Sequence, residues 1–135
     1  MPGRAIVMSL VVAVSFVMLA LPSDAAADCR DRTSLSPTVD GEAIAAIGRA
    51  EAWSENAGAQ QTFMVEVAAE VPDGSQFFVF ANGGPAGSMT IAGGIGALDL
   101  GNVNGGPLPA GVDSVCSIGP ISVTDANGMT LLSGF

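Results

Sequence analysis

QTFMVEVAAEV, residues 61–71, is the stretch that decides the fold class of this chain. Successive side chains of a β-strand point to opposite faces of the sheet, so polarity that alternates with a period of two marks a half-buried strand. One face of this stretch is apolar and holds Phe63, Val65, Val67 and Ala69. The other face carries the carboxylates of Glu66 and Glu70, beside Met64 and Ala68. The pattern predicts a strand with one buried and one solvated face.

The segments on either side of this strand also alternate. In Gly48–Glu55, the small residues Ala50, Ala52 and Ser54 share one face, which predicts a second strand. Val71-Pro72-Asp73-Gly74 is typical of a tight turn, because proline presets φ and glycine tolerates positive φ. We therefore expect 63–71 and 76–81 to form an antiparallel hairpin.

Gln76–Ala81 is apolar on both faces, which is typical either of a central strand or of an exposed patch. Phe78 and Phe80 share one face, and this pair is the candidate partner surface.

Short strand patterns and turns fill the rest of the chain. Asn82–Pro85 predicts a turn, 93–96 a flexible or bulged stretch, and 101–111 an irregular loop. Asp40–Ile47 fits a short helix capped by Asp40 or a strand, and the pattern leaves both open. Further strands are expected at 88–92, 97–100, 112–118, 121–124 and 129–135. About seven to nine short strands in one domain indicate an all-β antiparallel sandwich, with immunoglobulin domains as the architectural comparison.

The last hairpin has two possible registers. A two-residue loop at Asn127-Gly128 would place Val123 opposite Leu132. A three-residue loop that begins at Ala126 would place Val123 opposite Leu131 and gather Ile121, Met129 and Phe135 on the same face. Because sheets set register by gathering apolar side chains on one face, we expect the three-residue loop, with Gly128 left-handed.

The first 27 residues read as a targeting segment. Arg4 precedes an apolar run from Ala5 to Leu21, and small residues at 25–27 form a cleavage site. We therefore expect residues 1–27 to be a signal peptide and residues 28–135 to be a single domain, secreted or periplasmic.

The expected mature chain is strongly acidic. It holds twelve carboxylates against Arg30, Arg32 and Arg49, and its net charge is −9. Nucleic acid and anionic membrane surfaces would be repelled, so neither is expected as a partner. Histidine and lysine are absent from the sequence, which excludes catalysis by a serine–histidine or cysteine–histidine pair and by a lysine amine.

Cys29 and Cys116 are the two cysteines. An even number of cysteines in an exported chain predicts a disulfide, which here would hold the N-terminal lead against the C-terminal part of the sheet.

From Gly48 onward the chain resembles an uncharacterised set of small exported bacterial β-proteins. The residues that carry this resemblance are Gly48–Ala52, Phe63–Val67, Val71–Ser75, Asn82-Gly83 and Leu131–Phe135. The resemblance implies an exported β-domain and brings no catalytic residue with it.

Two further patterns bear on function. Asp99, Asn102 and Asn104 place oxygen atoms at short spacing, which makes them a weak calcium candidate; turn formation explains the same residues. Glu66 and Glu70 could act as a carboxylate pair in a hydrolase acting on glycans, but a solvated outer strand face is the preferred explanation of both. We expect a non-catalytic exported binding or structural domain without a cofactor, whose partner is another protein or an envelope component. The alternative is a small hydrolase that uses only carboxylates.

Overall fold

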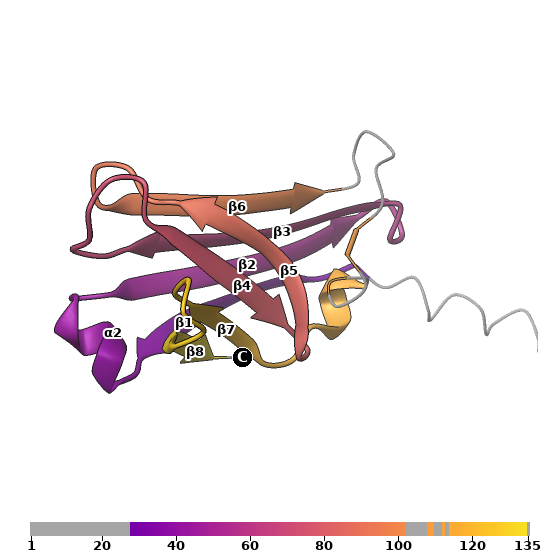
Figure 1. Ribbon diagram of the computed structural model, residues 1–135. Coiled ribbons are helices and arrows are strands. Elements are labelled where there is room, and N and C mark those ends of the chain that lie inside the picture. The colour runs from indigo at the N-terminus through magenta and orange to yellow at the C-terminus, as the bar shows by residue number, and fades with distance from the viewer. Residues whose placement is uncertain (1–27, 102–107, 110–111, 113, 135) are drawn as a thin grey trace, which may run out of the picture.

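The chain forms an all-β domain of short antiparallel strands (Figure 1). The structure, a computed structural model, describes residues 28–101, 108–109, 112 and 114–134. The expected signal peptide at 1–27 lies outside this range. Within it, the strands are β1 (Arg30–Pro37), β2 (Ile47–Glu55), β3 (Gln60–Ala68), β4 (Gln76–Ala81), β5 (Gly84–Thr90), β6 (Ile95–Gly101), β7 (Ile121–Thr124) and β8 (Thr130–Gly134). The helices are α2 (Val39–Ala43) and the 3₁₀ turn η2 (Val115–Ser117).

The eight strands of the described residues lie in one sheet with the order β5-β4-β7-β8-β1-β2-β3-β6. Residues 30–35 of β1 pair with β2 and residues 36–37 pair with β8, so β1 joins two layers that face each other. Figure 1 shows β4 and β5 crossing over β2 and β3. The result is a sandwich that is nearly closed like a barrel. Its two layers are continuous, unlike the separate sheets of immunoglobulin domains.

The edge strands β5 and β6 come together because glycines line the gap between them. A Cβ atom on Gly96 would meet the Ile91 side chain at 2.7 Å, and one on Gly87 would meet Leu98 at 2.8 Å. The turn between these strands has Gly93 and Gly94 at positive φ, which suits glycine. The strand β6 begins at Ile95, so it takes in the second half of the stretch 93–96, expected to be flexible or bulged, together with the short strand expected at 97–100.

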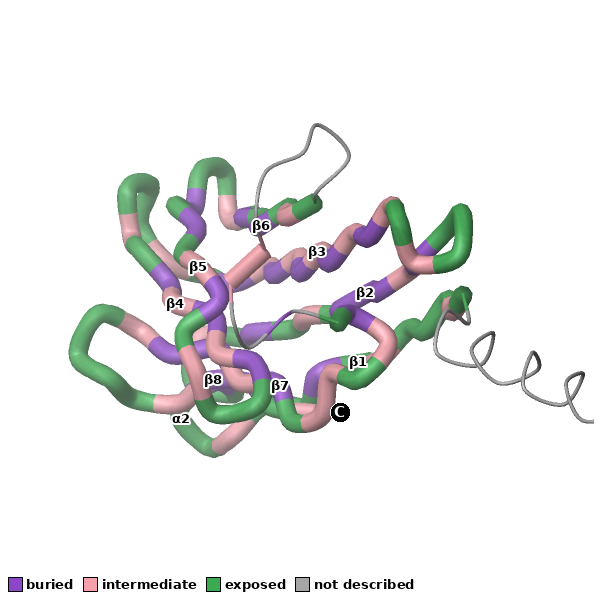
Figure 2. Tube along the Cα trace, turned by 90° about the vertical axis from the view of Figure 1, so that its right-hand side faces the viewer, coloured by how far each residue is buried: buried purple, intermediate pink, exposed green. Residues whose placement is uncertain are grey.

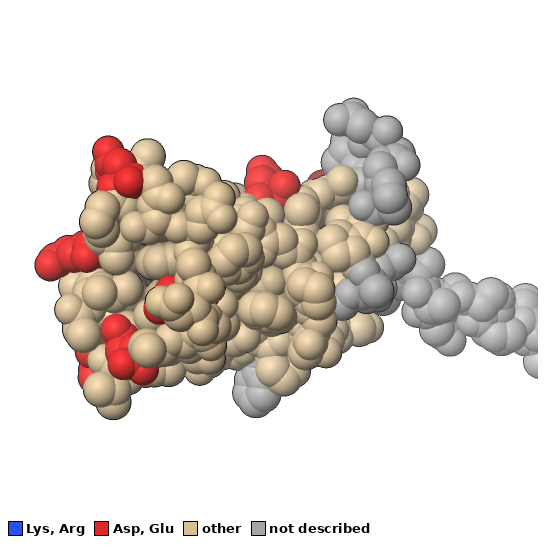
Figure 3. All heavy atoms as spheres, viewed as in Figure 1, with Lys and Arg blue, Asp and Glu red and all other residues tan. Residues whose placement is uncertain are grey.

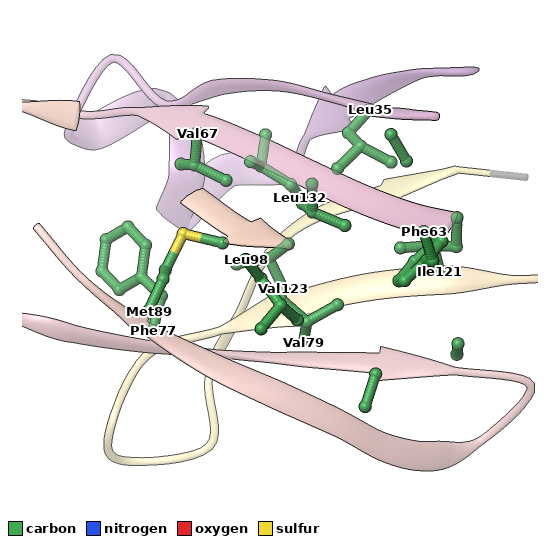
Figure 4. Close-up of a cluster of buried hydrophobic side chains, with 14 of the residues drawn as sticks. Leu35, Phe63, Val67, Phe77, Val79, Met89, Leu98, Ile121, Val123 and Leu132 are labelled. Carbon is green, nitrogen blue, oxygen red and sulfur yellow. The ribbon is translucent and has the colours of Figure 1, made fainter. Parts of the chain in front are cut away.

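The core lies between the two layers. Along β3, buried and half-buried residues alternate as the sequence predicts, and Phe63, Val65 and Val67 are buried (Figure 2). Figure 4 shows side chains of both layers pointing toward one another, among them Phe63 and Val79. On β2, Ala50, Ala52 and Ser54 share one face as predicted, and the structure buries this face as well.

The expected hairpin between β3 and β4 is wrong. β3 pairs with β2 and β6, whereas β4 pairs with β5 and β7. The connection instead passes from one layer to the other, and its backbone bonds to the segment after β5: Gly74 N donates to Ile91 O, and Ile91 N donates to Ser75 O. Local turn chemistry places a bend at Pro72 but does not select the partner strand.

The sequence left open whether Asp40–Ile47 is a helix or a strand, and the structure forms its first part as the helix α2. Thr38 caps α2, because its Oγ1 accepts a hydrogen bond from Gly41 N at 3.1 Å, whereas Asp40 lies inside the helix. The chain then enters β2 at Ile47. Among the described residues no helix is long and apolar enough to span a bilayer.

The β7–β8 hairpin has the expected three-residue loop, with Gly128 at φ +87°. Asp125 organises the loop, because its Oδ1 accepts hydrogen bonds from Asn127 N and Met129 N, both at 2.9 Å. The expected pairing of Val123 with Leu131 is wrong, because the register shifts within the hairpin and Val123 lies opposite Leu132.

This bulge buries both leucines, Leu131 at 3% and Leu132 at 0% exposure. The predicted inward place of Met129 is wrong, since 45% of it is exposed, and Phe135 lies outside the described residues.

The predicted strand at 112–118 is also wrong in the described part. Val115–Ser117 forms η2, and Val115 N donates to the side chain of Gln61 at 2.9 Å. This bond ties the turn to β3 and buries Val115, so the apolar residues here are covered without a ladder partner.

Candidate functional site

The two layers differ sharply in charge. Within the described chain, β4, β5, β7 and β8 contain no acidic or basic residue, although the protein has a net charge of −9. We call the outer surface of these four strands the uncharged face. Its outward residues are Gln76, Phe78, Phe80, Pro85, Ser88, Thr90, Ser122, Thr124, Thr130 and Ser133.

Phe78 and Phe80 lie at the centre of the uncharged face. Both are half-buried, while the alternate residues Phe77 and Val79 are buried in the core. Phe78 is flanked by Ser88 on β5 and by Thr124 on β7. The sequence-based candidate patch therefore lies on the outer side of β4, where the neighbours of Phe78 are Ser88 and the buried Thr124, and those of Phe80 are Pro85 and Ser122.

Acidic side chains gather elsewhere. Figure 3 shows most of them at the end of the molecule that carries α2 and the β3–β4 connection, with a further acidic patch on the upper edge, and no lysine or arginine is visible in this view. The acidic residues of these two segments are Asp40, Glu42, Glu70 and Asp73.

The outer surface of β1, β2, β3 and β6 carries the three arginines of the described residues. We call it the charged face, and the strand registers arrange it in rows. One row is Ser34, Arg49, Glu66 and Ala97; the next is Arg32, Glu51, Met64 and Asp99. The outer two rows hold Ile47, Ala68 and Ile95 at one end, and Arg30, Trp53, Thr62 and Gly101 at the other.

An ion-pair network occupies the middle of the charged face. Arg49 Nη2 and Nε both contact Glu66 Oε1, at 2.7 and 2.9 Å. The hydrogen bond to Glu66, and then the charge of Glu66, raise the pKa of the Arg49 guanidinium above its ordinary value. Glu51 is only 7% exposed and lies 3.4 Å from Arg32 Nε and 3.8 Å from Arg49 Nη1. Two arginines therefore compensate the buried carboxylate.

A groove of about 420 Å³ lies where the charged face meets the disulfide end, lined by Asp28, Cys29, Arg30, Trp53, Ser54 and Glu55. Arg30 stacks over the indole of Trp53, with its Cζ 5.4 Å from the ring centroid. Asp28 Oδ1 accepts hydrogen bonds from Gly58 N at 3.1 Å and from Ser54 Oγ at 3.4 Å. The groove thus combines an aromatic ring with two carboxylates, of which Asp28 also holds the β2–β3 loop.

The carboxylate pair of Glu66 and Glu70 is not brought together in a groove. Glu66 is paired with Arg49 on the charged face, whereas Glu70 follows the end of β3. A second groove, of about 370 Å³ beside α2, is lined by Asp40 and Asp125. Asp125 is again a turn residue, because it caps the β7–β8 loop.

Only one of the three residues of the calcium candidate lies within the described residues. Asp99 is an exposed residue of β6, and Asn102 and Asn104 lie outside the described residues. Among the described residues no group of three or more cysteine, aspartate or glutamate side chains could hold a metal ion.

Cys29 and Cys116 form the predicted disulfide, with Cα atoms 5.8 Å apart. It joins the residue before β1 to the middle of η2, so the N-terminal lead is attached near the end of the chain. A disulfide of this kind is consistent with an oxidising, exported compartment.

No protein-family model, curated protein or solved structure matches this chain.

Proposed function

We propose that the chain is an exported, non-catalytic binding domain that attaches to a macromolecular partner of the cell envelope through the uncharged face. The observation that carries the proposal is the complete absence of charge from the described strands β4, β5, β7 and β8 in a protein of net charge −9. Charged side chains keep the remaining surface solvated. Their exclusion from four adjacent strands supports a contact role for this face.

The chemistry of the face supports this assignment. The cores of protein interfaces are depleted of charged residues and enriched in aromatic ones, and their strongest contacts cluster near the centre. Phe78 and Phe80 occupy that centre, with uncharged neighbours on β5 and β7. The disulfide supports action outside the cytoplasm, in the periplasm or the medium.

The test adds a charge to the uncharged face without removing a core contact. Ser88 and Ser133 are both exposed there, and Ser34 is an exposed serine of the charged face. The disulfide-bonded domain 28–135 is used to capture partners from the native envelope. We expect Ser88→Arg and Ser133→Arg to abolish the specific capture, and the matched control Ser34→Arg to retain it. Equal capture by all three variants would contradict the proposal.

A small hydrolase acting on glycans is the second candidate, favoured by the groove that Asp28 and Glu55 share with Trp53. The hydrogen bonds of Asp28 to the β2–β3 loop indicate a structural role and favour the binding domain. Release of reducing ends from neutral glycans by the wild type, abolished in both Asp28→Asn and Glu55→Gln, would support the hydrolase. Absence of any such release would exclude it for the glycans tried.

A further inference from the structure

The charges of the charged face are sorted by strand. The comparison covers the four rows in which β2, β3 and β6 are all paired. In these rows, β1 and β2 carry three arginines and one glutamate: Arg30, Arg32, Arg49 and Glu51. The β3 and β6 half of the same rows carries Glu66 and Asp99 and no arginine. One half of the face is therefore net positive and the other net negative. Glu55, at the end of β2, lies beyond these rows.

We propose that this face binds a second copy of the chain, related by a two-fold axis that runs parallel to the strands between β2 and β3. Such an axis, lying in the interface, places β1 over β6 of the second copy and β2 over β3 of the second copy. Each row of one copy then lies over the same row of the other copy. The positive half of each copy then covers the negative half of the other copy, so the same contact forms twice, as in any isologous interface.

The strand registers identify which residues of the two copies would face each other. Arg49 faces Glu66 of the second copy, because both belong to one row and lie on β2 and β3. Arg32 faces Asp99 of the second copy, because both belong to the next row and lie on β1 and β6. Each contact occurs twice. At the ends of the face, Ile47 meets Ala68 and Trp53 meets Thr62.

One further observation favours a second copy over another occupant, whereas the net charge of −9 opposes self-association and makes the opposed charges of this face necessary for it. Ile47 and Ile95 on this face are 64% and 61% exposed, and they lie in one row across β2, β3 and β6. With Arg49 and Glu66 they line a groove of about 330 Å³ that a second copy would cover.

The size of the face sets the strength of the contact. Four strands at the usual spacing, over about seven residues each, span about 20 Å by 20 Å. The resulting footprint of about 400 Å² is half of what each partner contributes to a standard stable interface. The proposal is therefore a weak dimer whose population rises with protein concentration.

Arg32 and Asp99 offer the sharpest test, because they lie on the two outermost strands of the face. β2 and β3 separate them by about 14 Å, so they form no pair within one chain. Sedimentation equilibrium of the disulfide-bonded domain 28–135 measures the dimer dissociation constant. We expect Arg32→Glu and Asp99→Arg each to weaken self-association by at least about tenfold, because like charges then oppose each other.

An equimolar mixture of the two variants is expected to restore association, since the glutamate introduced at position 32 of one chain would face the arginine introduced at position 99 of the other. Glu42→Arg makes the same charge change as Asp99→Arg on α2, away from the face, and serves as the control. Circular dichroism checks folding, and Arg49→Glu mixed with Glu66→Arg is the second pair should Arg32→Glu unfold. A wild type that stays monomeric at about 1 mM, or a mixture that fails to associate, would overturn the proposal.

Discussion

Removal of the disulfide is predicted to lower stability more than any single surface change. The bond closes a loop of 87 residues, which in the chain-entropy model stabilises the folded state by about 4.5 kcal/mol. For a domain of 108 residues, each kcal/mol lost from the free energy of unfolding lowers the melting temperature by about 4–5 °C. We therefore expect the double variant Cys29→Ser/Cys116→Ser to melt about 20 °C below the oxidised wild type.

The native contacts near the bond explain why most of this effect acts through the unfolded chain. Without the disulfide, Cys29 O still accepts a hydrogen bond from Ser54 N at 2.9 Å. At the other end, η2 keeps the bond from Val115 N to Gln61. β1 also keeps its ladder with β2, so the folded state loses little besides the cross-link itself.

Differential scanning calorimetry and urea unfolding of domain 28–135 measure the change. Reduction of the wild type should reproduce it, because the reduced thiols and the serines leave the same loop open. A loss below about 1 kcal/mol in both samples would refute the chain-entropy reasoning. A large loss in the serine variant alone would show instead that packing around the half-buried cysteines matters.

Two further predictions concern the core and α2. Leu132 is fully buried, so Leu132→Ala should lower the free energy of urea unfolding by about 2–5 kcal/mol, whereas Met129→Ala, at an exposed site, should change it by less than about 0.5 kcal/mol. Gly41→Ala should destabilise by about 1–3 kcal/mol despite the better helix propensity of alanine, because the new Cβ would overlap the carbonyl oxygen of Leu131. Ala43→Gly at an exposed helix position should cost no more than about 1 kcal/mol, and a stabilised Gly41→Ala would contradict the packing argument.

Two of the errors of sequence reasoning share one cause, which is that local patterns do not identify a strand's partner. The alternation in 61–71 places Phe63 and Val65 in the core, because side-chain direction depends only on the backbone period. The turn at Pro72 was predicted, but the partner of β4 is decided by which ladder edges remain open, and both edges of β3 are already occupied. Likewise, the loop at Gly128 follows from its residues, while the bulge at Leu131 depends on a core that accepts two adjacent leucines.

By itself, the sequence determined the all-β class, the disulfide, the acidic charge and the shared face of Phe78 and Phe80, since each depends on composition, short-range periodicity or cysteine number. Only the tertiary structure decided how charge is distributed over the surface. Residues 76–81, 84–90, 121–124 and 130–134 are uncharged in the printed sequence, yet they become one face only because β4 pairs with both β5 and β7. The arginines likewise find their partners through long-range registers, because Arg32 meets Glu51 on β2 and Arg49 meets Glu66 on β3. Pairing between distant strands is set by the packing of the whole core, and no local stretch of sequence encodes it.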